Sequence, residues 1–451
     1  MIAPARIAAF DILSAVSAGN ADLPSAIAFT RGGLRDDRDR ALAAEIATGV
    51  QRWRAALDHL IVDFSKRPLE RLDPEIVEIL RLSAYQLLHL TRVPASAIVD
   101  DAVDLARRAG KTSAAGFVNA VVRTISRRRD SLPLPARPRD STDRAAALAY
   151  FSITLSHPRW LAARWYDRLG FEAAERWLRF DNTEAPVTLR VNRLKASPAD
   201  VIERLAAEGV QTRLARFAPD GMIVEAGYPL RGPGVEQGWF VVQDEASQLV
   251  ALLASAKPGE RVLDACASPG GKATAIAADM QGRGLLVACD VRSRRVALLR
   301  KTISTTGATN VRIVQADLLR PLPFSRPFDT VVVDAPCSGL GTLRRDPDIR
   351  WRRRESDLPT LAAAELTMLR HAAAQVAGGG RLVYATCSSE PDENEAVVDA
   401  FLAAAPQFRP VDVRTAAPAL GPVADDRGHL KTQPHLHDLE AFFAALFERT
   451  P

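Results

Sequence analysis

From residue 258 onward the sequence alternates between short apolar runs and amphipathic segments. The apolar runs are ERVLDACAS, GLLVACD, VRIVQAD, FDTVVVDAP and GRLVYATCS, and helical periodicity fills GKATAIAADM, SRRVALLRKTISTTG, residues 358–377 and NEAVVDAFLAAA. Continuous apolar strands separated by amphipathic helices are typical of a mostly parallel sheet covered on both faces. We therefore predict an α/β domain over residues 241–451, with a ligand site at the carboxyl ends of its strands.

The N-terminal part of the chain has a different pattern. Residues 1–130 place apolar side chains at three- and four-residue spacing with few β-branched runs, which predicts a compact helical domain. The proline-rich segment SLPLPARPRD follows, and no helix continues through it. The next part, residues 142–240, mixes both patterns and is expected to form a small α/β subdomain with helices at 156–170 and 197–209 and strands at 187–192, 212–217 and 221–226.

Length and composition exclude several classes of protein. The chain has 451 residues, 47% of them hydrophobic, which is enough for two or three domains. No apolar run approaches the roughly 18 to 20 residues that cross a bilayer, and the start lacks the order of a secretory signal, so we expect a soluble, cytoplasmic protein. The cysteines have no C-x-x-C spacing, so neither a disulfide framework nor a zinc site is expected; they are Cys266, Cys289, Cys337 and Cys387.

The basic residues gather in clusters. The formal charge is +5, and ISRRRD, RSRR and LRRDPDIRWRRRESD concentrate arginine. Guanidinium groups pair with phosphates and stack on bases, which favours a nucleic-acid partner. A charge run is also commonly a solvated face, and arginine bias can reflect the base composition of a genome, so the clusters alone leave the partner open.

A Pro-Gly-Gly turn and two aspartates follow the first three predicted strands of the α/β domain. Pro269, Gly270 and Gly271 let the backbone approach a ligand at the start of a helix, and the spacing does not match a phosphate loop, so a nucleoside cofactor fits better. Asp290, about 20 residues on, is placed to accept hydrogen bonds from ribose hydroxyls. Asp317 is expected at an adenine edge. One aspartate at a strand end is often only a helix cap, but carboxylates at successive strand ends favour a site.

The next two strand ends carry thiols. Asp334, Pro336 and Cys337 follow the fourth strand, and Cys387 follows the fifth. A single buried cysteine is commonly an inert apolar residue. Two thiols on neighbouring strand ends, beside a predicted nucleoside site, favour a reactive role. A thiol near a helix N-terminus and arginines is expected to have a lowered pKa and to act as a nucleophile.

Several of these segments resemble known motifs. DACASPGGKA, VVVDAPCSGLGTLRRDPDIRW and ATCSSEPDENE resemble the signature motifs of the RNA cytosine-5 methyltransferases of the Nop2/Sun family, and SHPRWLAARW, LRVNRLK and VVQDEASQLV add to the similarity. LRLSAYQLLHLTRVPASAIVDDAVDLARRA and GFVNAVVR resemble the RNA-binding domain of the antitermination factor NusB. The resemblance implies a NusB-like domain over 1–130, an RNA-binding linking subdomain over 142–240 and a Rossmann-like methyltransferase domain over 241–451.

The resemblance also implies an activity and residue roles. It implies methylation of carbon 5 of a cytosine in 16S ribosomal RNA, with S-adenosylmethionine as the cofactor. Cys387 is implied to attack carbon 6 of the cytosine, and Cys337 to assist loss of the carbon 5 proton and release. Asp334 is implied to contact both the cofactor and the cytosine amino group. The other implied cofactor residues are Cys266, Ala267, Ser268, Pro269, Gly270, Gly271, Lys272, Asp290 and Asp317.

The implied RNA substrate leads to further expectations. We expect a single-stranded or loop target, because a cytosine in a duplex must be flipped out to reach the thiols. Arg344, Arg345 and Arg350 are expected to hold the RNA backbone beside that base. The 16S RNA is expected as the partner, free or in an early assembly intermediate, with no obligate protein partner and no membrane.

Three alternatives compete with this interpretation. The same chemistry on another RNA, such as transfer RNA, is disfavoured by the NusB-like domain without being excluded. A non-catalytic RNA-binding adaptor would be expected to have lost a cysteine or an acidic strand end, and none is missing. An amino-group methyltransferase would need an Asn/Asp-Pro-Pro-aromatic motif where this chain has DAPC.

The C-terminal segment departs from the family pattern. The family usually shows Asp-Gly-Phe-Phe where this chain reads HDLEAFFAALFER, so Phe442 and Phe443 match but the glycine does not. This leaves the local turn within 438–446 open. The preceding stretch contains three histidines without a fourth ligand, so a surface loop is expected rather than a metal site; they are His429, His435 and His437.

Overall fold

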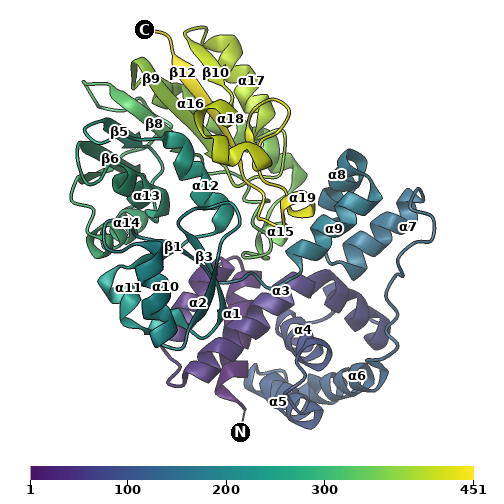
Figure 1. The fold of residues 1–451 in the computed structure, drawn as a ribbon. Coiled ribbons are helices and arrows are strands. Elements are labelled where there is room, and N and C mark those ends of the chain that lie inside the picture. Colours follow the sequence, from purple (N-terminus) through teal and green to yellow (C-terminus); the bar gives the residue numbers. More distant parts are fainter. Residues whose placement is uncertain (1) are drawn as a thin grey trace. The chain divides into compact units, whose positions relative to one another are not determined.

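A computed structural model of the protein describes residues 2–451, which separate into two compact units (Figure 1). The first unit runs up to Thr183 and also takes in Leu343–Glu355, and the second contains Glu184–Thr342 and Ser356–Pro451. The boundary between the two units, at 183–184, falls within residues 142–240, which the sequence predicts as one subdomain. Residues 142–183 form helices that pack with the first unit. No helix within residues 2–451 is long and apolar enough to span a membrane.

The first unit is built from helices, which the spacing of apolar residues predicts for residues 1–130. Helices α1 to α6 share one apolar core that includes Ile46, Leu80 and Val122. The elements of this unit are α1 (Pro4–Ser17), α2 (Leu23–Arg31), α3 (Asp37–Ser65), η1 (Leu69–Arg71), α4 (Pro74–His89), α5 (Ala95–Arg108), η2 (Thr112–Ala114), α6 (Ala115–Arg128), α7 (Arg144–Ala149), η3 (Tyr150–Thr154), α8 (Arg159–Leu169), α9 (Phe171–Asp181) and α15 (Ile349–Arg352).

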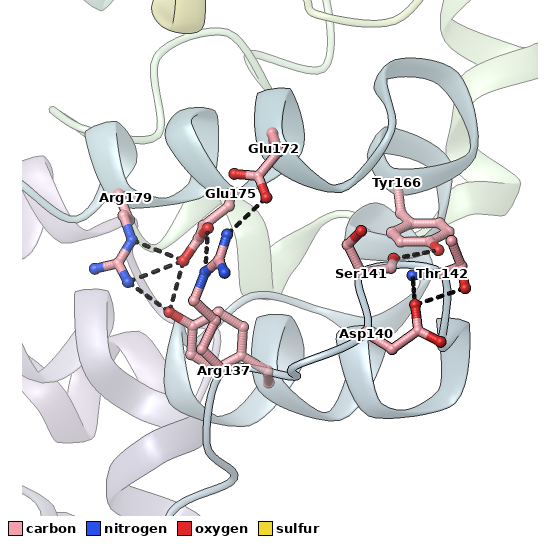
Figure 2. Close-up of polar contacts among 9 residues, drawn as sticks. Arg137, Asp140, Ser141, Thr142, Tyr166, Glu172, Glu175 and Arg179 are labelled. Atoms are coloured by element: carbon pink, nitrogen blue, oxygen red, sulfur yellow. Dashed lines mark hydrogen bonds and ion pairs between the residues drawn. The ribbon is translucent and has the colours of Figure 1, made fainter.

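The proline-rich segment between α6 and α7 has no helix, as predicted, and polar contacts hold it in place (Figure 2). Arg137 donates hydrogen bonds to Glu172 Oε1 at 2.7 Å and to Glu175 Oε2 at 2.9 Å. Glu175 also accepts from the hydroxyl of Tyr150 and from the guanidinium of Arg179. The segment is therefore fixed on α9 by a shared carboxylate.

The second unit begins with a four-stranded antiparallel sheet in the order β2-β3-β1-β4. Ser197 caps α10 in a capping box with Asp200, which explains why the helix begins at Pro198. The predicted order of strand, helix, strand and strand is confirmed. The elements are β1 (Thr188–Val191), α10 (Pro198–Ala207), β2 (Gln211–Leu214), β3 (Gly221–Ala226), η4 (Pro229–Arg231), α11 (Pro233–Gln237) and β4 (Phe240–Val242).

The predicted mostly parallel sheet forms the rest of this unit. Its order is β10-β12-β9-β8-β5-β6-β7, with β11 beside β12, and the pairs among β5 to β9 are parallel. Its strands are β5 (Arg261–Asp264), β6 (Leu285–Asp290), β7 (Val311–Gln315), β8 (Phe328–Asp334), β9 (Val376–Thr386), β10 (Phe408–Val411), β11 (Leu430–Lys431) and β12 (Phe443–Arg449).

Helices cover both faces of this sheet, as predicted. Helices α12 to α14 contribute to one apolar core and α16 and α17 to the other, and residues of the strands alternate between the two cores. The helices are α12 (Glu245–Ala254), α13 (Gly271–Asp279), α14 (Ser293–Thr306), η5 (Glu355–Asp357, partly in the first unit), α16 (Leu358–Ala373), α17 (Glu395–Ala404), α18 (Val413–Ala416), η6 (Pro418–Val423) and α19 (Pro434–His437). The carboxyl ends of the parallel strands share one edge, where ligands bind in such sheets.

Candidate active site

The two predicted reactive thiols lie side by side. Cys337 follows β8 by three residues and Cys387 follows β9 directly, and their Sγ atoms are 3.3 Å apart. Neither cysteine forms a disulfide, and both are half-buried. Because β8 and β9 are parallel neighbours with Asp334 opposite Ala385, the loops that leave these strands meet at the same edge of the sheet.

The charges around the two thiols differ. The hydrogen bond with Cys387 and burial raise the pKa of Cys337 well above its ordinary value, and the charges of Glu393 and Glu365 raise it further. The predicted lowering of the thiol pKa is therefore wrong for Cys337, because its hydrogen bond with Cys387, its burial and the nearby carboxylates all raise this pKa. The ammonium of Lys272, in contrast, interacts electrostatically with Cys387.

Lys272 links three parts of the site. Its Nζ lies 2.6 Å from Oδ2 of Asp334, which ends β8, and 5.6 Å from the ring centroid of Phe442. Burial alone would lower the pKa of Lys272, but the charge and hydrogen bond of Asp334 reverse this, and the net pKa is raised. The lysine therefore remains a cation at the start of α13.

A cavity of about 200 Å³ lies beside this ion pair. The predicted cofactor residues that line it are Ala267, Ser268, Pro269, Gly271, Lys272 and Asp334. Residues that the sequence reasoning did not assign also line it, namely Val241, Val242, Gln243, Ser247 and Thr302. Cys266 belongs to the same loop without lining the cavity, and burial raises the pKa of its thiol well above the ordinary value.

The two glycines of the loop form a close-fitting turn. Gly270, the N-cap of α13, has a φ of +109°, which side-chain-bearing residues rarely adopt. A Cβ added to Gly271 would lie 3.1 Å from Cδ of Gln243. The side chains of Ser268 and Arg295 each donate a hydrogen bond to the other residue's backbone carbonyl. The loop before α13 is therefore packed against Gln243 and tied to Arg295.

The two acidic residues of the next strand ends lie along the same edge. Asp290 is buried, accepts a hydrogen bond from the Arg292 amide at 3.2 Å and pairs with Arg295 at 3.3 Å. Asp317 is more exposed and accepts from the Leu319 amide at 3.0 Å, as a cap does. The Ala316 amide donates to the Asp290 carbonyl, which connects the two strand ends. Neither carboxylate lines the cavity.

These residues fit S-adenosylmethionine, the cofactor that the sequence resemblance implies. Gly270 and Gly271 pack closely against Thr302 and Gln243, which line the cavity. Asp290 offers a carboxylate for ribose hydroxyls, and the Lys272–Asp334 pair presents both charges that a zwitterionic amino acid group needs. The donor set therefore suits a nucleoside that carries an amino acid.

Arg190 supports the loop in a way that sequence reasoning missed. It is buried on β1 and donates to Oε1 of Gln243 at 2.8 Å, to Oγ1 of Thr274 at 2.6 Å and to the Gly271 carbonyl at 3.1 Å. One guanidinium thus joins the small sheet to the start of α13. The only sequence signal for it was the similarity of LRVNRLK to the family.

The three arginines predicted to hold RNA belong to the first unit, and Arg350 does not have that role. Its side chain is fully buried and donates to the Ser156 carbonyl at 3.0 Å and to Oδ1 of Asn182 at 2.9 Å, so its guanidinium is not available to a phosphate. Arg344 lies over the ring of Phe180 at 4.4 Å. Arg344 and Arg345 are half-buried and remain predictions.

The departure from the family pattern at the C-terminus is accommodated without a glycine. Ala441 stands where the family has glycine, and it is not among the residues within 2–451 that have a positive φ. Its amide donates a hydrogen bond to the Gly341 carbonyl at 2.9 Å. The Gly341 amide in turn donates to the Cys387 carbonyl at 2.9 Å. A Cβ on Gly341 would lie 2.0 Å from the Ala441 carbonyl oxygen, so this glycine permits the close approach.

The histidines of this region do not form one surface loop. His429 is buried, with its ring centroid 5.1 Å from that of Phe443 and its Nδ1 3.3 Å from Asp425, so the surface interpretation is wrong for this residue. His435 and His437 are half-buried. Among residues 2–451 no group of three or more His, Cys, Asp or Glu side chains is arranged to hold a metal.

Three protein families match successive parts of the chain. Residues 251–448 match the family described as 16S rRNA methyltransferase RsmB/F. Residues 3–127 match the NusB family, and residues 157–231 match the ferredoxin-like domain described as Methyltr_RsmF/B-like.

Curated relatives match the chain over most of their length. The chain is 34% identical over 411 residues to the probable ribosomal RNA small subunit methyltransferase B of Bacillus subtilis, covering 90% of each protein. It is 34% identical over 436 residues to the ribosomal RNA small subunit methyltransferase B of Pseudomonas putida, covering 94% of this chain and 96% of that protein. The crystal structure of PH0851 matches with a TM-score of 0.81 and 25% identity, covering 100% of this chain and 99% of the other.

The matches extend through the helical, ferredoxin-like and methyltransferase parts of the chain, in that order. Their extent agrees with the resemblance that the strand-end motifs indicate. The chain therefore belongs to the RsmB/F family of 16S rRNA methyltransferases, which use S-adenosylmethionine as the methyl donor.

Proposed function

We propose that this protein methylates carbon 5 of a specific cytosine in 16S ribosomal RNA through a covalent adduct with Cys387. The observation that carries this proposal is the pair of thiols, 3.3 Å apart, that follow the strand ends beside the Lys272–Asp334 ion pair. The family supports the choice of ribosomal RNA. The choice of cytosine as the target base and the covalent step are supported by the positions of the two thiols.

Cys387 is the proposed nucleophile. The Lys272 ammonium interacts electrostatically with Cys387, and the thiolate of Cys387 is the group proposed to attack carbon 6 of the cytosine. Formation of the sulfur–carbon bond moves the π electrons of the ring toward carbon 5, which becomes nucleophilic. S-adenosylmethionine supplies the methyl group as an electrophilic sulfonium methyl.

Cys337 is the proposed residue for release. It keeps its proton while Cys387 is a thiolate, because the hydrogen bond to Cys387 and burial raise the pKa of Cys337. Once Cys387 is bonded to carbon 6, its negative charge no longer opposes ionisation of Cys337. Cys337 then loses its proton to solvent and takes the proton from carbon 5, and the electron pair left behind expels Cys387.

Asp334 is proposed to orient the base. Its Oδ2 is held by Lys272 at 2.6 Å, and its side chain is partly exposed, so the second oxygen can accept a hydrogen bond from the cytosine amino group. The cofactor residues proposed from the sequence keep their roles, with Ala267, Ser268, Pro269, Gly271 and Lys272 supported by the cavity they line.

The first unit is proposed to contact the RNA, because its N-terminal residues match the NusB family. Arg344 and Arg345 remain the proposed contacts to the RNA backbone beside the target base. Either isolated 16S RNA or an early assembly intermediate is the proposed form of the substrate, since a cytosine in a single strand or loop reaches the thiols without breaking a duplex.

A transfer experiment tests the substrate and the position. Labelled methyl transfer is measured on isolated 16S RNA, assembled small subunits and transfer RNA, followed by bisulfite mapping of the product. The expected result is incorporation into one cytosine of 16S RNA, loss of incorporation in Cys387→Ala, and wild-type incorporation in Cys289→Ala, whose thiol is fully buried on β6 and does not line the cavity. Incorporation into transfer RNA alone, or at a position other than carbon 5, would contradict the proposal.

A further inference from the structure

Glu393 binds the serines next to both thiols, and none of the proposed catalytic steps uses it. We propose that Glu393 is a positioning residue, whose carboxylate holds the two thiol-bearing turns together and sets the distance between Cys337 and Cys387. This inference deepens the proposed function, and its effect on turnover rests on that function. Its effect on the spacing of the sulfur atoms does not.

The carboxylate binds the residue that directly follows each thiol. Glu393 is fully buried and accepts hydrogen bonds from the amide of Ser338 at 2.6 Å and from its hydroxyl at 2.6 Å. The hydroxyl of Ser388 donates to the same carboxylate. Since Ser338 follows Cys337 and Ser388 follows Cys387, one side chain connects both turns.

This link begins where the backbone pairing of the strands ends. The last paired residues of β8 and β9 are Asp334 and Ala385, and both cysteines lie beyond them. On the Cys387 side, Asn394 accepts from the Thr386 hydroxyl at 2.5 Å and donates to the Ser388 carbonyl at 3.0 Å. These contacts fix one turn only, so Glu393 supplies a connection between the two that Asn394 does not.

The surroundings of Glu393 hold its carboxylate in place. Burial and the charge and hydrogen bond of Glu393 raise the pKa of the neighbouring Glu365 to about 10, so Glu365 is protonated at neutral pH. The Tyr384 hydroxyl donates to the Glu393 carbonyl at 2.6 Å. A carboxylate that receives several hydrogen bonds from buried donors has little freedom to move, which suits a group that fixes a distance.

The charge of Glu393 also acts on Cys337. After the Cys387 hydrogen bond and burial, it is one of the causes that raise the pKa of Cys337. Removing the charge should therefore make Cys337 ionise at lower pH, whereas removing the hydrogen bonds should let the turns move apart. The first consequence should speed alkylation of Cys337, and the second should slow formation of the Cys337–Cys387 disulfide, so the two can be measured separately.

The test compares Glu393→Gln with a matched control. Glutamine keeps the shape of the side chain but has one acceptor oxygen in place of two, so it cannot receive all three serine hydrogen bonds. Glu395→Gln, two residues along the chain, removes a carboxylate that pairs with Lys431 and does not bind the thiol turns. Thermal unfolding of each variant shows whether the fold is retained.

The spacing of the thiols is measured without RNA or cofactor. Diamide oxidises the pair: one thiolate adds to its nitrogen–nitrogen double bond, the second thiol attacks the sulfur of this adduct, and the sulfur–nitrogen bond breaks as the disulfide forms. Two electrons and two protons end on the resulting hydrazine. Mass spectrometry follows the Cys337–Cys387 disulfide, and iodoacetamide labelling follows the ionisation of Cys337 against pH. We expect Glu393→Gln to crosslink more slowly although its Cys337 is alkylated faster, and Glu395→Gln to match the wild type.

Turnover is measured on the same variants. Glu393→Gln should lower kcat on the order of 10²-fold with an unchanged KM for S-adenosylmethionine, since small displacements of reacting groups have effects of that size. Ser388→Ala, which removes one link, should show smaller changes in the same directions and remains informative if Glu393→Gln does not fold. Wild-type crosslinking in Glu393→Gln or Ser388→Ala would overturn the positioning role. If crosslinking depended on Glu393 but the wild type transferred no methyl group, the positioning role would stand and the proposed function would be contradicted.

Discussion

A single residue, Asp264, at the edge of the sheet that carries the candidate site, makes the stability of the fold depend on pH. It ends β5 with a fully buried side chain, and burial, with the charge of Asp334 adding to it, raises the pKa of Asp264 to about 7 from 3.8. Between these values the folded protein keeps a proton that the unfolded chain has lost. The stabilisation from this group is therefore complete below pH 4 and falls by up to about 1.4 kcal/mol per pH unit until pH 7.

The first prediction is that Asp264→Asn removes this dependence. The free energy of unfolding, measured with urea at pH 5 and pH 7.5, should fall more for the wild type than for the variant, by up to about 3 kcal/mol over that interval. Asparagine keeps the shape of the side chain and cannot ionise. If both proteins lost the same stability between the two pH values, Asp264 would not carry the raised pKa.

The sequence predicts residues of this site where their position in the pattern is local. Gly270, Asp334, Cys337 and Cys387 follow apolar strands, so their place at the edge of the sheet can be read from the chain. Arg190 is 81 residues from the Gly271 carbonyl that it binds, and no local pattern reveals that contact. The type of a residue also misleads: arginine suggested RNA binding for Arg350, whereas its burial gives it a structural role.

Among the elements, the segment Leu343–Glu355 depends on that buried arginine. Arg350 belongs to α15 and donates to carbonyl and amide oxygens of Ser156, Asp181 and Asn182, all within the first unit. Burial lowers the pKa of Arg350 to about 10, so it stays charged at neutral pH. Removal of one partner from such a buried network leaves other groups without hydrogen bonds.

The second prediction concerns this segment. Arg350→Ala should destabilise the first unit by about 3 to 5 kcal/mol, whereas Arg107→Ala should cost at most about 1 kcal/mol, because Arg107 forms an exposed ion pair with Asp104. Urea unfolding of both variants gives the comparison. Equal losses would show that the buried arginine does not hold the segment.

Periodicity predicted the helices of residues 1–130 and the strands β5 to β9, but not the last strands of the sheet. Residues 443–447 of β12 are buried on both faces, so the strand shows no alternation of apolar and polar residues. Its sequence, FAALFER, contains good helix formers and has no strong turn signal. Pairing with β9 and β10, from Phe443 opposite Thr386 onward, decides its conformation.

At the scale of the whole molecule, the fold class was predictable and the division of the chain was only partly so. A helical part, a small α/β part and a doubly covered sheet follow from the order of periodicities. The return of Leu343–Glu355 to the helical unit, a few residues after Cys337, does not. Contacts between segments about 190 to 300 residues apart, such as those of Arg350 with Ser156 and of Trp351 with Gln51, cannot be read from local patterns.

The covalent adduct between Cys387 and the target cytosine is the central claim, and one measurement tests it directly. Cys337→Ala is incubated with 16S RNA and S-adenosylmethionine, denatured and digested, and the peptide that carries the nucleotide is identified by mass spectrometry. Because the variant forms the adduct but lacks the thiol for release, the nucleotide should be attached to Cys387, and Cys387→Ala should form no adduct. Attachment to Cys337 in Cys387→Ala, with none in Cys337→Ala, would contradict the assignment.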